Sequence, residues 1–117
     1  IGAEGVPVGD YTRMAWKRLG EQGLHENVVS VEQDTRSIVA KVALGEADAG
    51  FAYATDARAA GSTVSVIQLP PEAQPRVTYL MAVVTRGQNR ELAGSFVRKV
   101  IGAPGRAALS RAGFGPP

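Results

Sequence analysis

The sequence predicts an α/β fold in which helices flank a mainly parallel sheet, and residues 33–56 give the clearest indication of it. The first half of this stretch has apolar residues at the spacing of a helix that lies on a sheet. These residues are Ile38, Val39, Val42 and Ala43. The second half, residues 49–53, is a short apolar run typical of a central strand that helices cover on both faces. A helix followed by a buried strand is half of a parallel α/β unit.

Both ends of this helix carry residues that favour a helix boundary. Asp34 is expected to cap the start, because its carboxylate can accept a backbone N–H of the first turn. Gly45 follows Leu44 at the expected end, where a glycine in the left-handed conformation commonly stops a helix. Thr35 therefore begins the helix, and Tyr53 ends the strand that follows it.

The segments before this stretch continue the alternation of helix and strand. Pro7 predicts a turn and then a helix that carries Met14 and Leu19 and stops at Gly20. Residues 27–31 include three valines and predict a strand. The order up to residue 53 is therefore helix, strand, helix, strand.

The segments after the stretch predict further helices and strands. Thr55 and Asp56 are expected to cap a short helix that ends at Gly61, and residues 64–69 predict a strand. A proline-rich linker follows, and the apolar run of residues 77–85 then predicts an extended segment between two lobes. The chain is then predicted to end with two helices.

The first C-terminal helix has an apolar face formed by Leu92, Phe96, Val97, Val100 and Ile101. Pro104 is expected to open the second helix, which runs through Leu109 and stops near Gly113. Phe114 is then expected to anchor the tail. This part of the chain is predicted to be a helical return segment.

Composition excludes several classes of protein. The net charge is +2, and the basic residues are scattered rather than gathered in a run, so we expect no nucleic-acid binding. The absence of cysteine excludes disulfides, thiolate metal sites and a cysteine nucleophile. No apolar run reaches the eighteen residues of a membrane-spanning helix.

The sequence offers no arrangement of residues typical of catalysis. His25 is the sole histidine, and it lies in a polar loop beside Glu26 without a partner for a triad or a metal site. The carboxylates Asp34, Asp48 and Asp56 each sit at an element boundary, where caps and turns explain them. We therefore expect a protein that is not an enzyme and that has no cofactor and no metal site.

Two helix starts and one tyrosine are expected to meet at one edge of the predicted sheet. In parallel α/β folds the strands end and the helices begin at this edge, and anions bind there. The helix starts hold Val8 with Gly9 and Thr35 with Arg36, and the tyrosine is Tyr53. Singly, each has a structural explanation as a turn residue, a cap or a core aromatic with a satisfied hydroxyl. Together they form a candidate oxyanion site.

Four segments resemble one known family. They read VPVGDYTRMAWKRLG, VEQDTRSIVAKVALGEADAGFAYATDA, PRVTYLMAVV and GAPGRAALSRAGFGPP. They resemble the C-terminal half of the molybdate-binding periplasmic proteins, which are type II periplasmic binding proteins and the solute receptors of molybdate ABC importers. The blocks GEADAGFAYATDA and GFGPP are fairly specific to that family, whereas the helices between them are generic.

The resemblance implies one lobe of a two-lobed fold that closes on molybdate or tungstate by a hinge motion. It places backbone N–H donors at Val8 and Thr35 and a hydroxyl donor at Tyr53, with Gly9 and Arg36 as secondary candidates. The family usually has alanine in place of Val8 and often valine in place of Thr35. Because both donors are backbone groups, these substitutions need not abolish binding, and the Thr35 hydroxyl is a hypothetical extra contact.

The resemblance also implies how the chain is organised and what it meets. Residues 1–76 would be the C-terminal portion of the second ligand-binding lobe. Residues 77–117 would be a crossover strand and helices that return to an N-terminal lobe, which is missing from this sequence. The expected partners are the oxyanion, that missing lobe and a membrane permease. The expected location is periplasmic or extracellular, with or without a lipid anchor on the missing N-terminal segment.

Two other functions stay open. The effector-sensing domain of a transcriptional regulator can share this fold, and an upstream helix-turn-helix would identify it. An enzyme on a similar scaffold would need a catalytic residue, and none was found.

Overall fold

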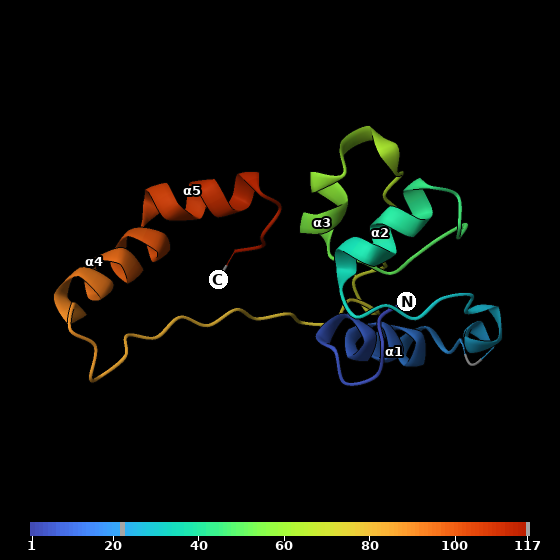
Figure 1. Cartoon of the computed structure of the whole chain (residues 1–117), viewed down its shortest axis with the longest axis horizontal. Helices are drawn as coiled ribbons and strands as arrows, with labels where there is room; N and C mark the ends of the chain where they lie inside the picture. The colour runs from blue at the N-terminus through green and yellow to red at the C-terminus, as the bar shows by residue number, and fades with distance from the viewer. Residues whose placement is uncertain (22, 117) are drawn as a thin grey trace. The chain divides into compact units, whose positions relative to one another are not determined.

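The computed structural model describes residues 1–21 and 23–116, and the chain divides into two compact units, Ile1–Arg76 and Val77–Pro117. The first unit holds α1 (Pro7–Leu19), η1 (Leu24–Asn27), α2 (Thr35–Ala43), α3 (Ala54–Ala59) and η2 (Gly61–Thr63). The second holds α4 (Arg90–Ile101) and α5 (Ala103–Arg111), as Figure 1 shows. The division falls at the boundary expected from the sequence, while the assignment of the two units to lobes of a larger protein stays a prediction.

Helix α1 begins and ends as the sequence predicts. Pro7 is its first residue, where a missing N–H costs nothing, and Gly20 caps its end at a φ of 74°. Its buried residues lie at the spacing of one helix face and are Val8, Gly9, Thr12, Ala15 and Trp16. The Trp16 ring meets Phe51 edge to face, with 5.6 Å between ring centroids. This contact joins α1 to the segment before α3 and forms the centre of a small core.

Helix α2 also has the predicted caps. Asp34 accepts a hydrogen bond from the backbone N–H of Ser37 at 2.9 Å, and Gly45 adopts a φ of 74° just after the helix. Ile38 is buried on the inner face of α2, whereas Ala43, which we expected on that face, is exposed. The apolar face is therefore narrower than the sequence predicted.

The caps predicted for α3 are wrong. The residue that precedes this helix is Tyr53, so Thr55 and Asp56 lie inside its first turn instead of before it. The predicted end is close, because Gly61 has a φ of 64° and follows the helix within two residues. A polar residue near a helix start favours capping, but the extended conformation of the preceding chain decides where the helix begins.

A single parallel bridge, between Gly2 and Glu32, represents the predicted sheet in the described residues. The Ala3 N–H donates to the Glu32 carbonyl at 2.8 Å, and the Glu32 N–H donates to the Ile1 carbonyl at 2.8 Å. The nitrogen of Ile1 donates to the Ser30 carbonyl at 3.0 Å. These evenly spaced bonds are the pattern of two parallel strands.

The four predicted strands, 27–31, 49–53, 64–69 and 77–85, are not strands in the described part of the chain. Residues 49–53 were also expected to be buried on both faces, yet Gly50 and Ala52 are exposed and Phe51 is half-buried. Apolar and β-branched residues favour an extended conformation, but a strand also needs a neighbour to accept its backbone hydrogen bonds. That neighbour is a distant segment, which local sequence does not specify.

The second unit consists of the extended residues 77–85 and a helical pair. Helices α4 and α5 lie where the sequence predicts them, and they pack against each other. A Cβ atom on Gly105 would lie 2.1 Å from the Val100 carbonyl oxygen, so this glycine permits the close approach. The Phe114 ring meets Tyr79 edge to face at 5.5 Å, which anchors the tail as predicted.

Candidate functional site

The parallel bridge brings two helix starts to one edge of the first unit. The bridged segments run in the same direction, and each leads into a helix, α1 in one case and α2 in the other. Because parallel neighbours point the same way, both helices begin on the same side. The first turns of the two helices therefore lie at a common edge, which the reader can follow near the N-terminus in Figure 1.

Val8 is the second residue of α1, ahead of the first intrahelical hydrogen bonds. Its side chain is buried, and its carbonyl accepts the Thr12 hydroxyl at 2.7 Å. The amide of Gly9, which the sequence named as a secondary donor, donates to the Val6 carbonyl at 2.9 Å. Gly9 is therefore not a free donor, and its role is steric.

Gly9 permits a very close approach between α1 and the bridged segment. A Cβ atom at this position would lie 1.9 Å from the Ala3 carbonyl oxygen and 2.6 Å from that of Gly2. Any side chain here would push the segment away from the start of α1. The position of the Val8 amide thus depends on a glycine.

Thr35 is the first residue of α2 and is 7% exposed. The preceding cap is well made, because Asp34 also accepts the Ser37 hydroxyl at 3.1 Å. The Ser37 backbone N–H, the Ser37 hydroxyl and the Arg36 N–H lower the pKa of the Asp34 carboxyl. The Arg36 side chain is exposed. The cap fixes the direction of the first turn of α2.

Tyr53 immediately precedes α3 and is half-buried. Its ring meets the ring of Tyr11 in α1 edge to face, with centroids 6.4 Å apart and an interplanar angle of 72°. Helices α2 and α3 also contact each other. The structure therefore links the segment of Tyr53 to both helices that carry the other two candidates.

Tyr11 was not singled out from the sequence, although a signal for it exists. It lies three residues after Val8, and residues at this spacing share one helix face. An aromatic residue on the face of a candidate donor is a reason to look for a second aromatic partner.

One charge at this edge opposes anion binding. Asp10 lies in the first turn of α1, and its carboxylate accepts the Gly5 N–H at 3.3 Å. A negative charge within one turn of Val8 offsets part of the favourable potential of the helix start. The Val8 amide alone is therefore a weak anion site, and further donors are needed.

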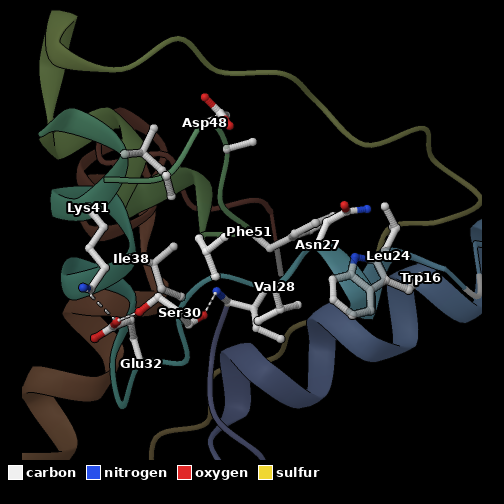
Figure 2. A pocket seen from close by; sticks show the side chains of 15 residues that line it. Trp16, Leu24, Asn27, Val28, Ser30, Glu32, Ile38, Lys41, Asp48 and Phe51 are labelled. Atoms are coloured by element: carbon white, nitrogen blue, oxygen red, sulfur yellow. Dashed lines mark hydrogen bonds and ion pairs between the residues drawn. The ribbon is translucent and has the colours of Figure 1, made fainter. Parts of the chain in front are cut away.

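A cavity of about 250 Å³ lies elsewhere in the first unit, and Figure 2 shows it. Its wall is formed mainly by apolar side chains of α1, η1, α2 and the extended segments, among them Trp16, Leu24, Val28, Ile38, Val42 and Phe51. None of the three main candidates lines it. The carboxylates of Glu32 and Asp48 do, so an anion would meet an apolar surface and like charges there.

The polar groups of the cavity are mostly paired with one another. Lys41 forms an ion pair with Glu32 at 3.6 Å, and the Ser30 hydroxyl also donates to Glu32 (Figure 2). Lys41 forms a second ion pair with Glu46 at 3.1 Å. The buried indole N–H of Trp16, which also lines the cavity, has no partner in the part of the chain that the structure describes. We interpret the cavity as an incompletely filled core between α1 and α2.

Within residues 1–21 and 23–116, no group of three histidine, cysteine, aspartate or glutamate side chains could hold a metal ion. His25 lies in η1 and is exposed. No helix among the described residues is both long and apolar enough to cross a membrane.

Comparison with known proteins gives consistent matches over almost the whole chain. The model of a family described as bacterial extracellular solute-binding protein matches residues 2–115. The chain is 36% identical over 113 residues to the molybdate-binding protein ModA of Mycobacterium tuberculosis H37Rv, which covers 96% of this chain and 42% of the relative. It is 30% identical over 111 residues to the molybdate-binding protein ModA of Escherichia coli K12, which covers 95% of this chain and 43% of the relative.

The chain thus spans less than half the length of these two curated relatives. No solved structure is significantly similar to it.

Proposed function

Because the chain belongs to the family of bacterial extracellular solute-binding proteins, we propose that it is part of a receptor that binds molybdate or tungstate between two lobes. The observation that carries the proposal is the common edge at which α1 and α2 begin, with Tyr53 linked to it. The names of the relatives, which are molybdate-binding proteins, support the choice of ligand. No observation favours the transcriptional regulator or an enzyme.

The proposed site binds a tetrahedral oxyanion through neutral donors. The backbone N–H groups of Val8 and Thr35 supply the partial positive charge of two helix starts, and the Tyr53 hydroxyl supplies a third hydrogen bond. Neutral donors suit a dianion that must also be released, because no opposite charge has to be separated from it. The Asp10 carboxylate makes additional donors necessary, and these would come from a second lobe.

Closure of two lobes would complete the site. Contacts of the anion with donors on both lobes favour the closed state over the open one, so binding and hinge motion are coupled. The second unit fits a role in packing on the other lobe, because large apolar side chains are exposed on it, among them Leu80 at 90% and Leu92 at 71%. The receptor would work with the membrane permease of an ABC importer in the periplasm or at the cell exterior, with or without a lipid anchor.

A chimera tests this function. The matched region of the Mycobacterium tuberculosis relative is replaced by this chain, and molybdate, tungstate and sulfate are titrated calorimetrically into the chimera, the intact relative and this chain alone. We expect the chimera to bind molybdate and tungstate and to discriminate against sulfate, and this chain alone to bind weakly. A folded chimera that binds none of the three anions would contradict the proposed function.

The site assignment has its own test in the same chimera. Tyr53→Phe removes one hydroxyl and keeps the ring, so affinity should fall by the value of one hydrogen bond to a charged group, about 1.5–3 kcal/mol. Tyr79→Phe is the matched control, because it removes a tyrosine hydroxyl in the second unit. If the parent chimera, Tyr53→Phe and Tyr79→Phe bound molybdate with equal affinity, the assignment of Tyr53 to the site would be wrong.

A further inference from the structure

Tyr11 and Tyr53 form the aromatic contact nearest to the candidate donors. Tyr11 lies in the second turn of α1, three residues after Val8, and its ring stands edge to face with Tyr53 at 6.4 Å and 72°. Both rings are half-buried. The contact therefore joins the helix that carries one proposed donor to the residue that carries another.

The backbone of Tyr53 is held at the start of α3, where its carbonyl accepts the N–H groups of Asp56 and Ala57 at 3.0 and 3.1 Å. Residues 49–53 form no ladder in the described chain, and Tyr53 makes no side-chain capping bond to α3. A tyrosine side chain can adopt more than one rotamer, and each alternative rotamer lowers the fraction of molecules that is ready to bind. The edge-to-face contact with Tyr11 favours one of these orientations of the Tyr53 ring.

We propose that Tyr11 is a positioning residue that holds the Tyr53 ring so that its hydroxyl faces the edge carrying the Val8 and Thr35 amides. This inference rests on the proposed function. The edge-to-face geometry is the preferred arrangement of two aromatic rings, and it fixes the ring plane as well as the distance. In this proposal Tyr11 does not contact the anion; it acts through Tyr53 alone.

The interaction energy of an aromatic pair determines the size of the expected effect. Because this energy is proposed to orient the Tyr53 hydroxyl, loss of the pair should lower the affinity for molybdate by about two- to tenfold. Tyr11→Leu removes the ring and should show this loss. Tyr11→Phe keeps the ring and should bind within about twofold of the parent, which makes it the conservative rescue.

A double-mutant cycle on the chimera separates positioning from a general structural role. Tyr11→Leu, Tyr53→Phe and the double variant are titrated with molybdate, since Tyr53→Phe leaves no hydroxyl to position. Tyr11→Leu should therefore cost little in the Tyr53→Phe background. Tyr79→Leu is the control, because Tyr79 and Phe114 form a pair of similar geometry, 5.5 Å and 76°, in the other unit.

Three results would overturn the proposal. The first is an equal loss from Tyr11→Leu with and without the Tyr53 hydroxyl, and the second is an equal loss from Tyr11→Phe and Tyr11→Leu. The third comes from tyrosine ring resonances in the NMR spectrum of the anion-free chimera: Tyr11→Leu should move those of Tyr53, and unchanged resonances would mean that the contact does not exist. Failure of the parent chimera to bind any anion would instead reject the proposed function, and the ring resonances would still report on the pair.

Discussion

Replacing Gly9 by alanine should destabilise the first unit, although alanine favours helices more than glycine does. The gain in helix propensity is at most about 1 kcal/mol. Against it stands the new Cβ atom, which would lie 1.9 Å from the Ala3 carbonyl oxygen. Since carbon and oxygen atoms in contact are normally about 3.3 Å apart, the bridged segment would have to move by roughly 1.4 Å.

That movement has an estimable cost. Overpacking of this kind typically costs about 1–3 kcal/mol. The displaced segment would also strain the hydrogen bond from the Ala3 N–H to Glu32, now 2.8 Å long, which contributes about 0.5–1.5 kcal/mol. After subtraction of the gain in propensity, we expect a net loss of about 1–3 kcal/mol in the free energy of unfolding.

Urea unfolding of the chimera, followed by far-ultraviolet circular dichroism, measures this loss. With a typical dependence of 1–3 kcal/mol per molar urea, the midpoint should fall by about 1 M. Gly23→Ala is the matched control, because a Cβ atom there would meet nothing within 4 Å, and it should change stability by less than about 0.5 kcal/mol. If Gly9→Ala were as stable as Gly23→Ala, the close approach of α1 to the bridged segment would be wrong.

Three further predictions concern the helix ends and the site. Asp34→Ala should lower the free energy of unfolding at neutral pH, because it removes the cap of α2. The folded-state pKa of Asp34 is depressed, so the cap stabilises the fold fully above the unfolded pKa, and this stabilisation is lost as the pH falls through the folded pKa. In acid unfolding, the stabilities of the parent and of Asp34→Ala should therefore converge at low pH. A difference in stability that stays constant with pH would refute this. Thr35→Val keeps the backbone amide and removes the hydroxyl, so it tests the hypothetical extra contact of that hydroxyl with the anion. On this hypothesis the affinity for molybdate, measured by calorimetry, should fall in Thr35→Val and be restored in Thr35→Ser. An unchanged affinity of Thr35→Val would reject the hypothesis. Gly105→Ala should lower the unfolding midpoint more than Gly115→Ala, since only the first places a Cβ atom 2.1 Å from the Val100 carbonyl oxygen.

Helix ends were predictable from sequence because their causes are local. A proline at the first position, a carboxylate cap and a glycine with positive φ each act within one turn, and all three were found at Pro7, Asp34 and Gly20. The resemblance to molybdate-binding proteins was likewise confirmed, since it depends on local blocks of residues.

The sheet was not predictable in the same way. Residues 49–53 have the composition of a buried strand, yet a ladder requires a specific distant neighbour, and the described chain provides one only between Gly2 and Glu32. The same reason explains why the contact of Gly9 with Ala3 and that of Tyr11 with Tyr53 were missed. Both join segments whose proximity follows from the bridge and from packing rather than from spacing along the chain.

The prediction of the three main site residues stays a prediction, although its geometry is now more specific. Val8 and Thr35 are placed at helix starts on a common side, and Tyr53 is linked to α1 through Tyr11. Of the secondary candidates, Gly9 has its amide engaged with Val6. The hydrogen-bonding state of an amide depends on where the helix begins, which sequence predicts only to within a residue or two.

The contact between Trp16 and Phe51 gives the chain an intrinsic optical probe. Trp16 is its sole tryptophan, and Phe51 lies two residues before Tyr53 on the same extended segment. The buried indole N–H has no hydrogen-bond partner among the described residues, and the ring lines the cavity of the first unit. A ligand that binds Tyr53 and shifts its segment would therefore change the surroundings of Trp16, more than one helix turn away from the proposed site. Binding could then be followed by the fluorescence emission of Trp16, without an attached label.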